Sequence, residues 1–170
     1  MVFDHVKMDE VDSVIRILSE ARARIGGLGI DQWQSGYPSR EVVVEDIALS
    51  RSFAARDEDG SLCGVFAVIE DGEPTYDKIY DGAWLTEGMP YLAVHRVAVA
   101  SDKLRRGVAS GIMRYAEQRA ETLGMASVRI DTHEGNIPMR GMLERGGYVY
   151  CGSIYLAGGE HRVAYEKRLK

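Results

Sequence analysis

The sequence predicts a single α/β domain, and three observations support this class. Its 170 residues lie within the ~100–200 residues that one domain usually contains. Apolar residues recur with helical spacing in some segments and form strand-like runs in others, so predicted helices and strands alternate along the chain. No internal repeat, low-complexity tract or linker interrupts this alternation.

The first half of the chain predicts three strands and two helices. A strand at residues 2–6 precedes a helix that Asp9 caps and that ends at Gly26–Gly27. A polar loop with aromatic residues follows, and Ser39 caps a second short helix that runs to about Leu49. Two further strands flank a turn whose Asp-Gly pair suits a positive φ, at residues 52–56 and 62–70.

The second half contains the two clearest elements. Residues 91–99 are almost continuously apolar, which is typical of a central strand covered on both faces. Residues 107–123 carry apolar side chains at helical spacing, which predicts a helix that Gly124 ends. Residues 72–90 show no clear pattern and form a long connection. The remaining elements are a strand at 127–132, a helix at 136–145, and a terminal hairpin with strands at 148–156 and 161–169.

Composition and charge exclude several classes of protein. With 21 basic and 26 acidic side chains the net charge is −5, which argues against a nucleic-acid binder that neutralises many phosphates. The apolar runs are far shorter than the ~20 residues of a membrane helix, and no secretory signal is visible. We therefore expect a cytoplasmic protein with neither a nucleic-acid nor a membrane partner. Cys63 and Cys151 lie too far apart for a zinc knuckle, and no metal is expected.

A glycine-containing turn after the apolar strand is the most informative segment. It leads into a helix that opens with small residues between Gly107 and Gly111. The first turn of a helix has about four backbone N–H groups without intrahelical partners, and the helix dipole is positive there. Arg105 and Arg106 precede it, where cations are unfavourable unless an anion binds. The segment therefore predicts a pyrophosphate site, although it is neither a P-loop nor a dinucleotide motif. The alternative is that the glycines serve only a tight turn and close helix packing.

Two motifs resemble the GNAT superfamily, the acetyl-CoA-dependent N-acetyltransferases. That family has an Arg/Gln-x-x-Gly-x-Gly/Ala turn; here Gly107 and Ala109 match it, and Leu104 stands in place of Arg or Gln. The family's second motif is Asn-x-x-Ala-x-x-Leu-Tyr-Glu-Lys-x-Gly-Phe. In this chain it is matched by Asn136, Glu144, Arg145, Gly147 and Tyr148.

The resemblance implies a fold and a coenzyme. The fold would contain a mixed central sheet of about six or seven strands with helices on both faces. Its parallel strands at 91–99 and 127–132 would splay apart, with the pantetheine arm of acetyl-CoA between them in the manner of strand addition. The residues implied for the coenzyme are Val97, Ala98, Val99, Leu104, Arg105, Arg106, Gly107, Val108, Ala109, Ser110 and Asn136.

Acetyl transfer to an amine needs a base that removes a proton from the amine. Asp131 is the first candidate, because some family members carry a catalytic glutamate at the matching position; alternatively it caps a loop or pairs with Arg129 or Arg140. His95 is the second, because a histidine titrates near neutrality; alternatively it is a hydrogen-bonded core residue. Since their strands would be neighbours, a His95 oriented by Asp131 is a further arrangement.

The leaving thiolate and the acceptor raise separate questions. The family commonly uses a tyrosine of the second motif as an acid, but Leu143 occupies that position. Either Tyr148, Tyr150 or Cys151 replaces it, or the thiolate leaves without help. The family resemblance places Trp33 and Tyr37 in a loop that borders the acceptor site; alternatively they pack in the core.

The sequence thus predicts an N-acetyltransferase that transfers the acetyl group of acetyl-CoA to a primary amine of a small molecule or peptide. The amine attacks directly with the help of a general base. Two alternatives stay open: an acyl-CoA-binding regulatory domain with little turnover, and a protein that binds ATP at the glycine turn. Because terminal hairpins in the family can exchange between subunits, a homodimer is plausible.

Overall fold

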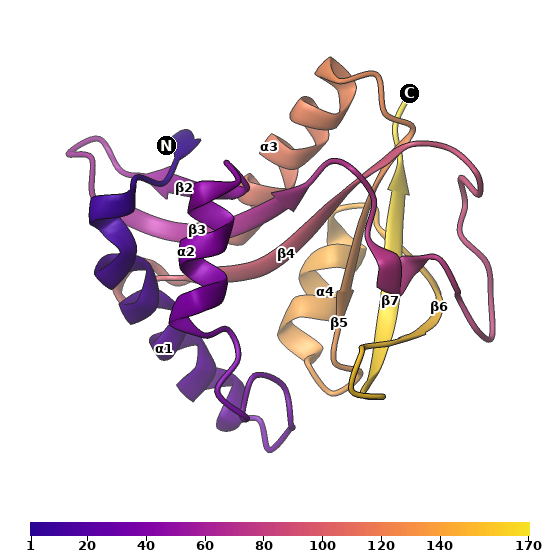
Figure 1. Ribbon diagram of the computed structural model, residues 1–170, viewed down its shortest axis with the longest axis horizontal. Helices are drawn as coiled ribbons and strands as arrows, with labels where there is room; N and C mark the ends of the chain where they lie inside the picture. Colours follow the sequence, from indigo (N-terminus) through magenta and orange to yellow (C-terminus); the bar gives the residue numbers. More distant parts are fainter. The chain divides into compact units, whose positions relative to one another are not determined.

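The computed structural model describes residues 1–170 and contains seven strands and four α-helices (Figure 1). The strands are β1 (Val2–His5), β2 (Ser52–Arg56), β3 (Leu62–Ile69), β4 (Tyr91–Val99), β5 (Ser127–Thr132), β6 (Val149–Tyr155) and β7 (His161–Arg168). The helices are α1 (Val11–Gly26), α2 (Arg40–Ala48), α3 (Val108–Thr122) and α4 (Ile137–Arg145), and the 3-10 helices are η1 (Met8–Glu10), η2 (Pro74–Tyr76) and η3 (Ser101–Lys103).

The strands form one mixed sheet in the order β1-β2-β3-β4-β5-β7-β6. The predicted α/β class and mixed sheet are therefore confirmed. β4 and β5 are parallel, and their register covers only Tyr91–Ala93 and Ser127–Arg129, the first three residues of each strand. This short pairing agrees with the predicted splay of the two strands.

Local boundaries differ from the predictions at a few residues. Asp9 does not cap α1, because residues 8–10 form η1 and α1 begins at Val11. The backbone N–H of Lys7 donates to Glu10 Oε1 at 2.9 Å instead. Ser39 caps α2 as predicted, since its hydroxyl accepts from the N–H of Val42 at 3.3 Å.

The chain forms two compact units, which are described separately. Unit 1 contains residues 1–68 and 96–112, and unit 2 contains residues 69–95 and 113–170. β4 therefore contributes its first five residues to unit 2 and its last four to unit 1. None of the helices combines the length and hydropathy that a membrane span requires.

In unit 1, helices cover both faces of the strands. α1 and α2 lie side by side (Figure 1) and share an apolar cluster with Val65 of β3 and Ala98 of β4. Gly64 precedes Val65 in β3 and faces the first turns of α3. A Cβ atom at Gly64 would lie 3.0 Å from Cγ1 of Val108. The alternation of faces along a strand thus places α1 and α2 on one side and the start of α3 on the other.

In unit 2, β5 and β7 pair in antiparallel fashion, with Ile130 opposite Tyr165 and Arg129 opposite Glu166. One face contacts α4, because Arg140 donates to the Tyr165 hydroxyl at 2.8 Å. The other face contacts the long connection between β3 and β4, which we call the acidic segment (residues 70–90). Side chains of the acidic segment form hydrogen bonds with residues of β5 and β7.

Candidate active site

The loop between β4 and α3, predicted to hold a pyrophosphate, is anchored within unit 1 at several points. The N–H of Ala100 donates to the Cys63 carbonyl at 2.8 Å, and Lys103 forms an ion pair of 2.8 Å with Asp57. From α1, Glu20 Oε1 accepts from the N–H of Ser101 at 2.9 Å. The start of the loop is therefore fixed by both α1 and the turn between β2 and β3.

The second half of this loop opens α3 through two residues of positive φ. Arg105 has φ of 63° and Gly107 has φ of 75°, and α3 begins at Val108. A Cβ at Gly107 would meet no atom within 4 Å, so glycine is required there by the backbone conformation and not by lack of space. Arg105 and Arg106 are exposed. The N–H groups of the first helical turn, from Val108 onward, have no intrahelical acceptors and remain available for an anion.

Ala98 and Val99 of β4, which are predicted to contact the coenzyme, both make contacts within unit 1. The Ala98 methyl group lies in the apolar cluster beneath α1, and its carbonyl faces Gly64 of β3. The Val99 carbonyl already accepts from Arg24 at 2.6 Å. In unit 2, the Asn136 side chain caps α4 by accepting from the N–H of Met139 at 3.3 Å and is 7% exposed. No finding tests their predicted coenzyme contacts, which stay predictions.

The aromatic loop predicted to border the acceptor is tied to β4 through Arg96. This arginine, with φ of 54°, makes a bidentate pair with Asp46 of α2, at 2.7 and 2.8 Å. It also donates to the Tyr37 hydroxyl at 2.7 Å. Trp33 is half-buried and packs against the apolar cluster of unit 1, and its predicted contact with the acceptor stays a prediction. Tyr37 is 43% exposed and remains a candidate for contact with substrate.

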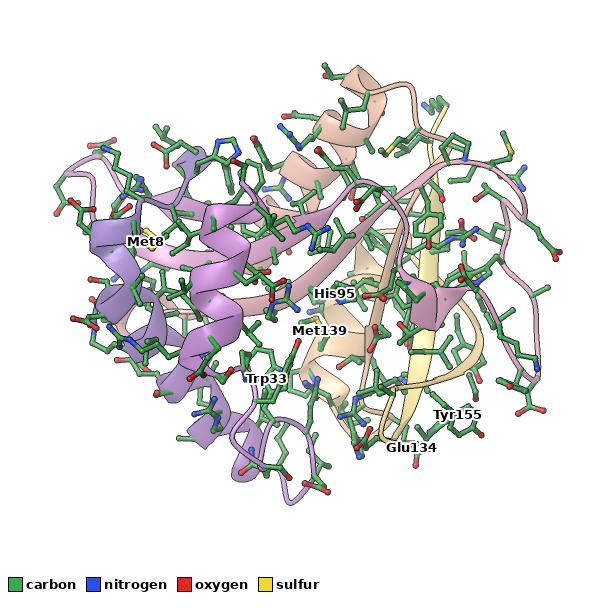
Figure 2. The ribbon with its side chains drawn as sticks, in the orientation of Figure 1. Met8, Trp33, His95, Glu134, Met139 and Tyr155 are labelled. Atoms are coloured by element: carbon green, nitrogen blue, oxygen red, sulfur yellow. The ribbon has the colours of Figure 1, made fainter.

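His95 lies in unit 2 beside a carboxylate that the sequence reasoning missed (Figure 2). Its Nε2 atom is 2.7 Å from Glu73 Oε1, and the two side chains are 16% and 20% exposed. Nε2 is buried and has no aligned hydrogen-bond partner despite this short contact. The imidazole holds the pKa of Glu73 below its usual value. Tyr91 fixes the Glu73 backbone, because its hydroxyl accepts from the Glu73 N–H at 2.8 Å.

Asp131 accepts a hydrogen bond from a buried tyrosine. The Tyr76 hydroxyl donates to Asp131 Oδ2 at 2.6 Å, and the Tyr76 ring centroid is 5.8 Å from that of His95. Burial, and then the charge of Asp131, raise the pKa of Tyr76 well above its usual value. Neither Arg129 nor Arg140 pairs with Asp131, and the carboxylate beside His95 is Glu73. The expected arrangement in which Asp131 orients His95 is therefore wrong.

Glu166 of β7 attaches the acidic segment to the sheet. It is fully buried and accepts from the Thr86 and Ser127 hydroxyls at 2.5 Å, from Arg129 Nε at 2.9 Å, and from the N–H of Leu85. Burial raises the pKa of Glu166, but these donors outweigh burial, so its pKa lies below the usual value. The guanidinium of Arg129 also lies over the Trp84 and Tyr91 rings. This network holds the segment that carries Glu73 and Tyr76.

The side chains that could protonate the leaving thiolate differ in their exposure to solvent. Leu143 is fully buried. Tyr148 is buried in the core, and its hydroxyl donates to Glu117 at 3.0 Å. Burial raises the pKa of Tyr148. Cys151 is buried, which raises its pKa to about 11. Tyr150 is 47% exposed and is the candidate that solvent and ligands can reach.

Glu73 and Tyr76 were not predicted as site residues, because the apolar residues of the acidic segment recur with neither helical nor strand spacing. Its signal lay in composition: carboxylates and aromatic residues concentrated immediately before an apolar central strand. No group of three or more His, Cys, Asp or Glu side chains is arranged to hold a metal ion.

Comparison with known proteins identifies a matching family. The sequence matches the family described as "Acetyltransferase (GNAT) family" over residues 18–148. A solved acetyltransferase of the GNAT family from Streptococcus agalactiae 2603 is 34% identical, with a TM-score of 0.89 and coverage of 99% of this chain and 95% of that chain. A search of curated proteins found no match.

More distant structures show the same fold. A GNAT-family acetyltransferase from Listeria monocytogenes 4b F2365 is 15% identical, with a TM-score of 0.76 and coverage of 99% of this chain and 94% of that chain. A chain of the NatC complex bound to Gag peptide and CoA is 12% identical, with a TM-score of 0.68 and coverage of 99% of this chain and 98% of that chain.

Proposed function

Because this chain belongs to the GNAT acetyltransferase family, we propose that it transfers the acetyl group of acetyl-CoA to a primary amine, with His95 as the general base. Family membership supports acetyl transfer as the reaction class. The observation that carries the choice of base is the contact of 2.7 Å between His95 and Glu73. A carboxylate beside an imidazole both orients the ring and stabilises its protonated form.

The contact with Glu73 assigns different roles to the two ring nitrogens. Nε2 faces the carboxylate and is buried, so this nitrogen carries the hydrogen in the neutral ring. Nδ1 then holds the lone pair and accepts the proton of the attacking amine, directly or through a water molecule. The amine nitrogen forms a bond to the thioester carbon, the C–S bond breaks, and coenzyme A leaves as the thiolate. The proton from nitrogen resides on His95 until solvent removes it.

Coenzyme binding is assigned to the loop at residues 104–110 in unit 1. The first N–H groups of α3 have no intrahelical acceptors, and the exposed side chains of Arg105 and Arg106 add positive charge. The rigid start of this loop supports the proposal, since a preformed anion site loses less conformational entropy on binding. Acetyl-CoA supplies the activated acyl group, and His95 takes the proton from the amine.

Two variants separate the candidate bases. We expect His95→Gln to lower kcat by about 100-fold or more, within the usual contribution of a general base. We expect Asp131→Asn to lower kcat less than about tenfold, because Asp131 positions Tyr76 and does not take the proton. Release of free thiol from acetyl-CoA in the presence of amines measures the rate. A calorimetric titration with acetyl-CoA checks that binding is retained.

His161→Gln is the matched control, because His161 contacts Ser153 in the terminal hairpin and not the proposed base. Its kcat should equal that of the unmodified protein. A loss in Asp131→Asn as large as in His95→Gln would identify Asp131 as the base.

One observation favours a second function, an acyl-CoA-binding regulatory domain. Leu143 replaces the tyrosine acid of the family, and it is fully buried. Tight binding of acetyl-CoA without thiol release for any amine would establish that function. Thiol release in the presence of an amine would exclude it.

A further inference from the structure

Tyr91 and His95 lie on the same strand and contact the same residue, Glu73. Both belong to the part of β4 in unit 2, and because side chains alternate along a strand, they share one face with Ala93. This face packs against the acidic segment, since Tyr91 and Ala93 lie in an apolar cluster with Tyr76. One face of β4 therefore carries both the proposed base and a second residue that reaches the partner of the base.

The Tyr91 hydroxyl holds the backbone of Glu73. It accepts from the Glu73 N–H at 2.8 Å and donates to the Glu73 carbonyl at 3.3 Å. The same carbonyl also accepts from the N–H of Tyr76 at 2.9 Å, within η2. Residues 70–73 belong to no helix or strand, so no ladder of backbone hydrogen bonds fixes Glu73. The position of Glu73 relative to β4 thus depends on the Tyr91 hydroxyl.

The two carboxylate oxygens of Glu73 have different neighbours. Oε1 lies 2.7 Å from Nε2 of His95, and Oε2 accepts from the N–H of Thr75 at 3.3 Å. A shift of the Glu73 backbone would move both oxygens and lengthen the contact with the ring. Because a misplacement of about 1 Å can lower an enzymatic rate by about 100-fold, the residue that fixes this backbone affects catalysis without touching the reacting atoms.

The Tyr91 ring is itself held in place. The guanidinium of Arg129 lies 4.0 Å from the Tyr91 ring centroid, and Arg129 is 4% exposed and paired with Glu166. The ring of Tyr76 lies 6.1 Å away. A cation over the face of an aromatic ring attracts the ring. The buried ion pair therefore gives Tyr91 a fixed support, and less conformational entropy is lost when its hydroxyl binds Glu73.

We propose that Tyr91 is a positioning residue for the base: its hydroxyl holds Glu73 so that the carboxylate faces Nε2 of His95. Tyr91 acts through Glu73 in this role. The carboxylate keeps the hydrogen of the neutral ring on Nε2, which leaves Nδ1 free to take the proton of the amine. The inference rests on the proposed role of His95 as the general base.

Removal of the hydroxyl alone tests the position of Glu73. Tyr91→Phe keeps the ring next to Arg129 but leaves the Glu73 N–H without its acceptor. The hydrogen bond to His95 holds the pKa of Glu73 below its usual value, so the Glu73 carboxyl should titrate at higher pH in this variant. NMR of side-chain carboxyl carbons follows this titration without any substrate. Glu73→Gln identifies the Glu73 signal, because that signal is then absent.

A double-mutant cycle tests whether Tyr91 acts through Glu73. We expect Tyr91→Phe to lower kcat by about fivefold and to leave the KM for acetyl-CoA unchanged. When it is added to Glu73→Gln, the same substitution should lower kcat by less than about twofold further, because the carboxylate that it positions is gone. Thiol release from acetyl-CoA, with the primary amine that reacts fastest, measures kcat. Tyr155→Phe is the matched control, because the exposed Tyr155 ring contacts His161 in the terminal hairpin and lies away from His95 (Figure 2).

The outcomes separate the inference from the function beneath it. An unchanged Glu73 titration or an unchanged kcat in Tyr91→Phe overturns the inference. An equal loss of kcat with and without Glu73→Gln also overturns it, since Tyr91 would then act independently of Glu73. If no amine releases thiol, or if His95→Gln retains the kcat of the unmodified protein, the proposed function fails. These last results are distinct from the Glu73 titration, which needs no turnover.

Discussion

Glu166 and Asp131 lie on the paired strands β7 and β5, and both accept hydrogen bonds from the acidic segment, but their surroundings differ. Glu166 is fully buried, has four donors and pairs with Arg129. Asp131 is half-buried and accepts from the Tyr76 hydroxyl, with no cation beside it. One carboxylate is therefore saturated with partners, and the other retains the capacity to bind a further donor.

The difference separates a carboxylate with a structural role from one that is available for chemistry. A buried charge is tolerated only when its hydrogen bonds are complete, so Glu166 can do no more than hold Thr86 and Leu85 in place. A partly exposed carboxylate with one partner keeps free lone pairs at little desolvation cost. Glu73, 20% exposed, accepts from the N–H of Thr75 at 3.3 Å and lies beside His95, so it also keeps lone pairs for a further donor. The segment thus has one fixed end, at residues 85–86, and one end with a partly exposed carboxylate, at Glu73.

The largest effect is expected from breaking the saturated network. Glu166→Ala leaves the Arg129 guanidinium, which is 4% exposed, as an unpaired buried charge. We expect the free energy of unfolding to fall by about 3–5 kcal/mol. Equilibrium unfolding in urea, followed by circular dichroism, measures this loss.

A double variant provides the control for this prediction. Replacing both partners, as in Arg129→Met with Glu166→Met, removes the unpaired charge and should destabilise the protein less than Glu166→Ala does. A double variant that is less stable than the single variant would show that the pair itself, and not the stranded charge, carries the stability.

The next largest effect is expected from a substitution of Glu73, the partly exposed carboxylate of the acidic segment. Glu73→Gln keeps the shape of the side chain but removes the charge 2.7 Å from His95. Because the ring holds the pKa of Glu73 below its usual value, Glu73 is ionised throughout a neutral pH range and stabilises the protonated base. We expect kcat to fall by about tenfold and the acid limb of the kcat/KM profile to move to lower pH by about one unit.

The matched control is Glu134→Gln, an exposed glutamate after β5 whose side chain contacts neither His95 nor Asp131. Its pH profile should be unchanged. Stability separates the two networks further: Glu73→Gln should change the free energy of unfolding by less than about 1 kcal/mol, since the exchange preserves side-chain volume near the surface. A loss as large as that of Glu166→Ala would place Glu73 in the scaffold.

Most of the fold could be predicted because its elements have strong local signals. The apolar run at Tyr91–Val99 and the apolar period of α3 identify their elements to within about two residues. The start of α1 was misplaced because Asp9 and Glu10 are both acidic residues compatible with a helix start, and only the structure shows a 3-10 turn there. The amino-acid composition does not indicate that the chain divides into two units.

The candidate site was predicted only in part. His95 was visible because it interrupts an apolar strand, and Asp131 because some members of the family carry a catalytic glutamate at the matching position. Their partners Glu73 and Tyr76 lie on an irregular segment, and contacts between residues 22 and 55 positions apart depend on how that segment folds onto the sheet. The resemblance to a family predicts that the glycine turn binds the coenzyme, but it could not place partners that lie outside the family's motifs.

The smallest effect is expected from the hydrogen bond that joins the segment to Asp131. Tyr76→Phe keeps the buried ring, whose centroid is 5.2 Å from Trp84, and removes only the hydroxyl. We expect a loss of about 1 kcal/mol in the free energy of unfolding, since half-buried Asp131 can take a water molecule as its donor. With His95 as the base, the acid limb of the kcat/KM profile should not move. Were Asp131 the base, the limb would move to higher pH, because the carboxylate loses a hydrogen bond that favours its charged form. The kcat/KM profile of this one variant, measured beside that of Glu73→Gln, therefore shows which end of the network takes the proton.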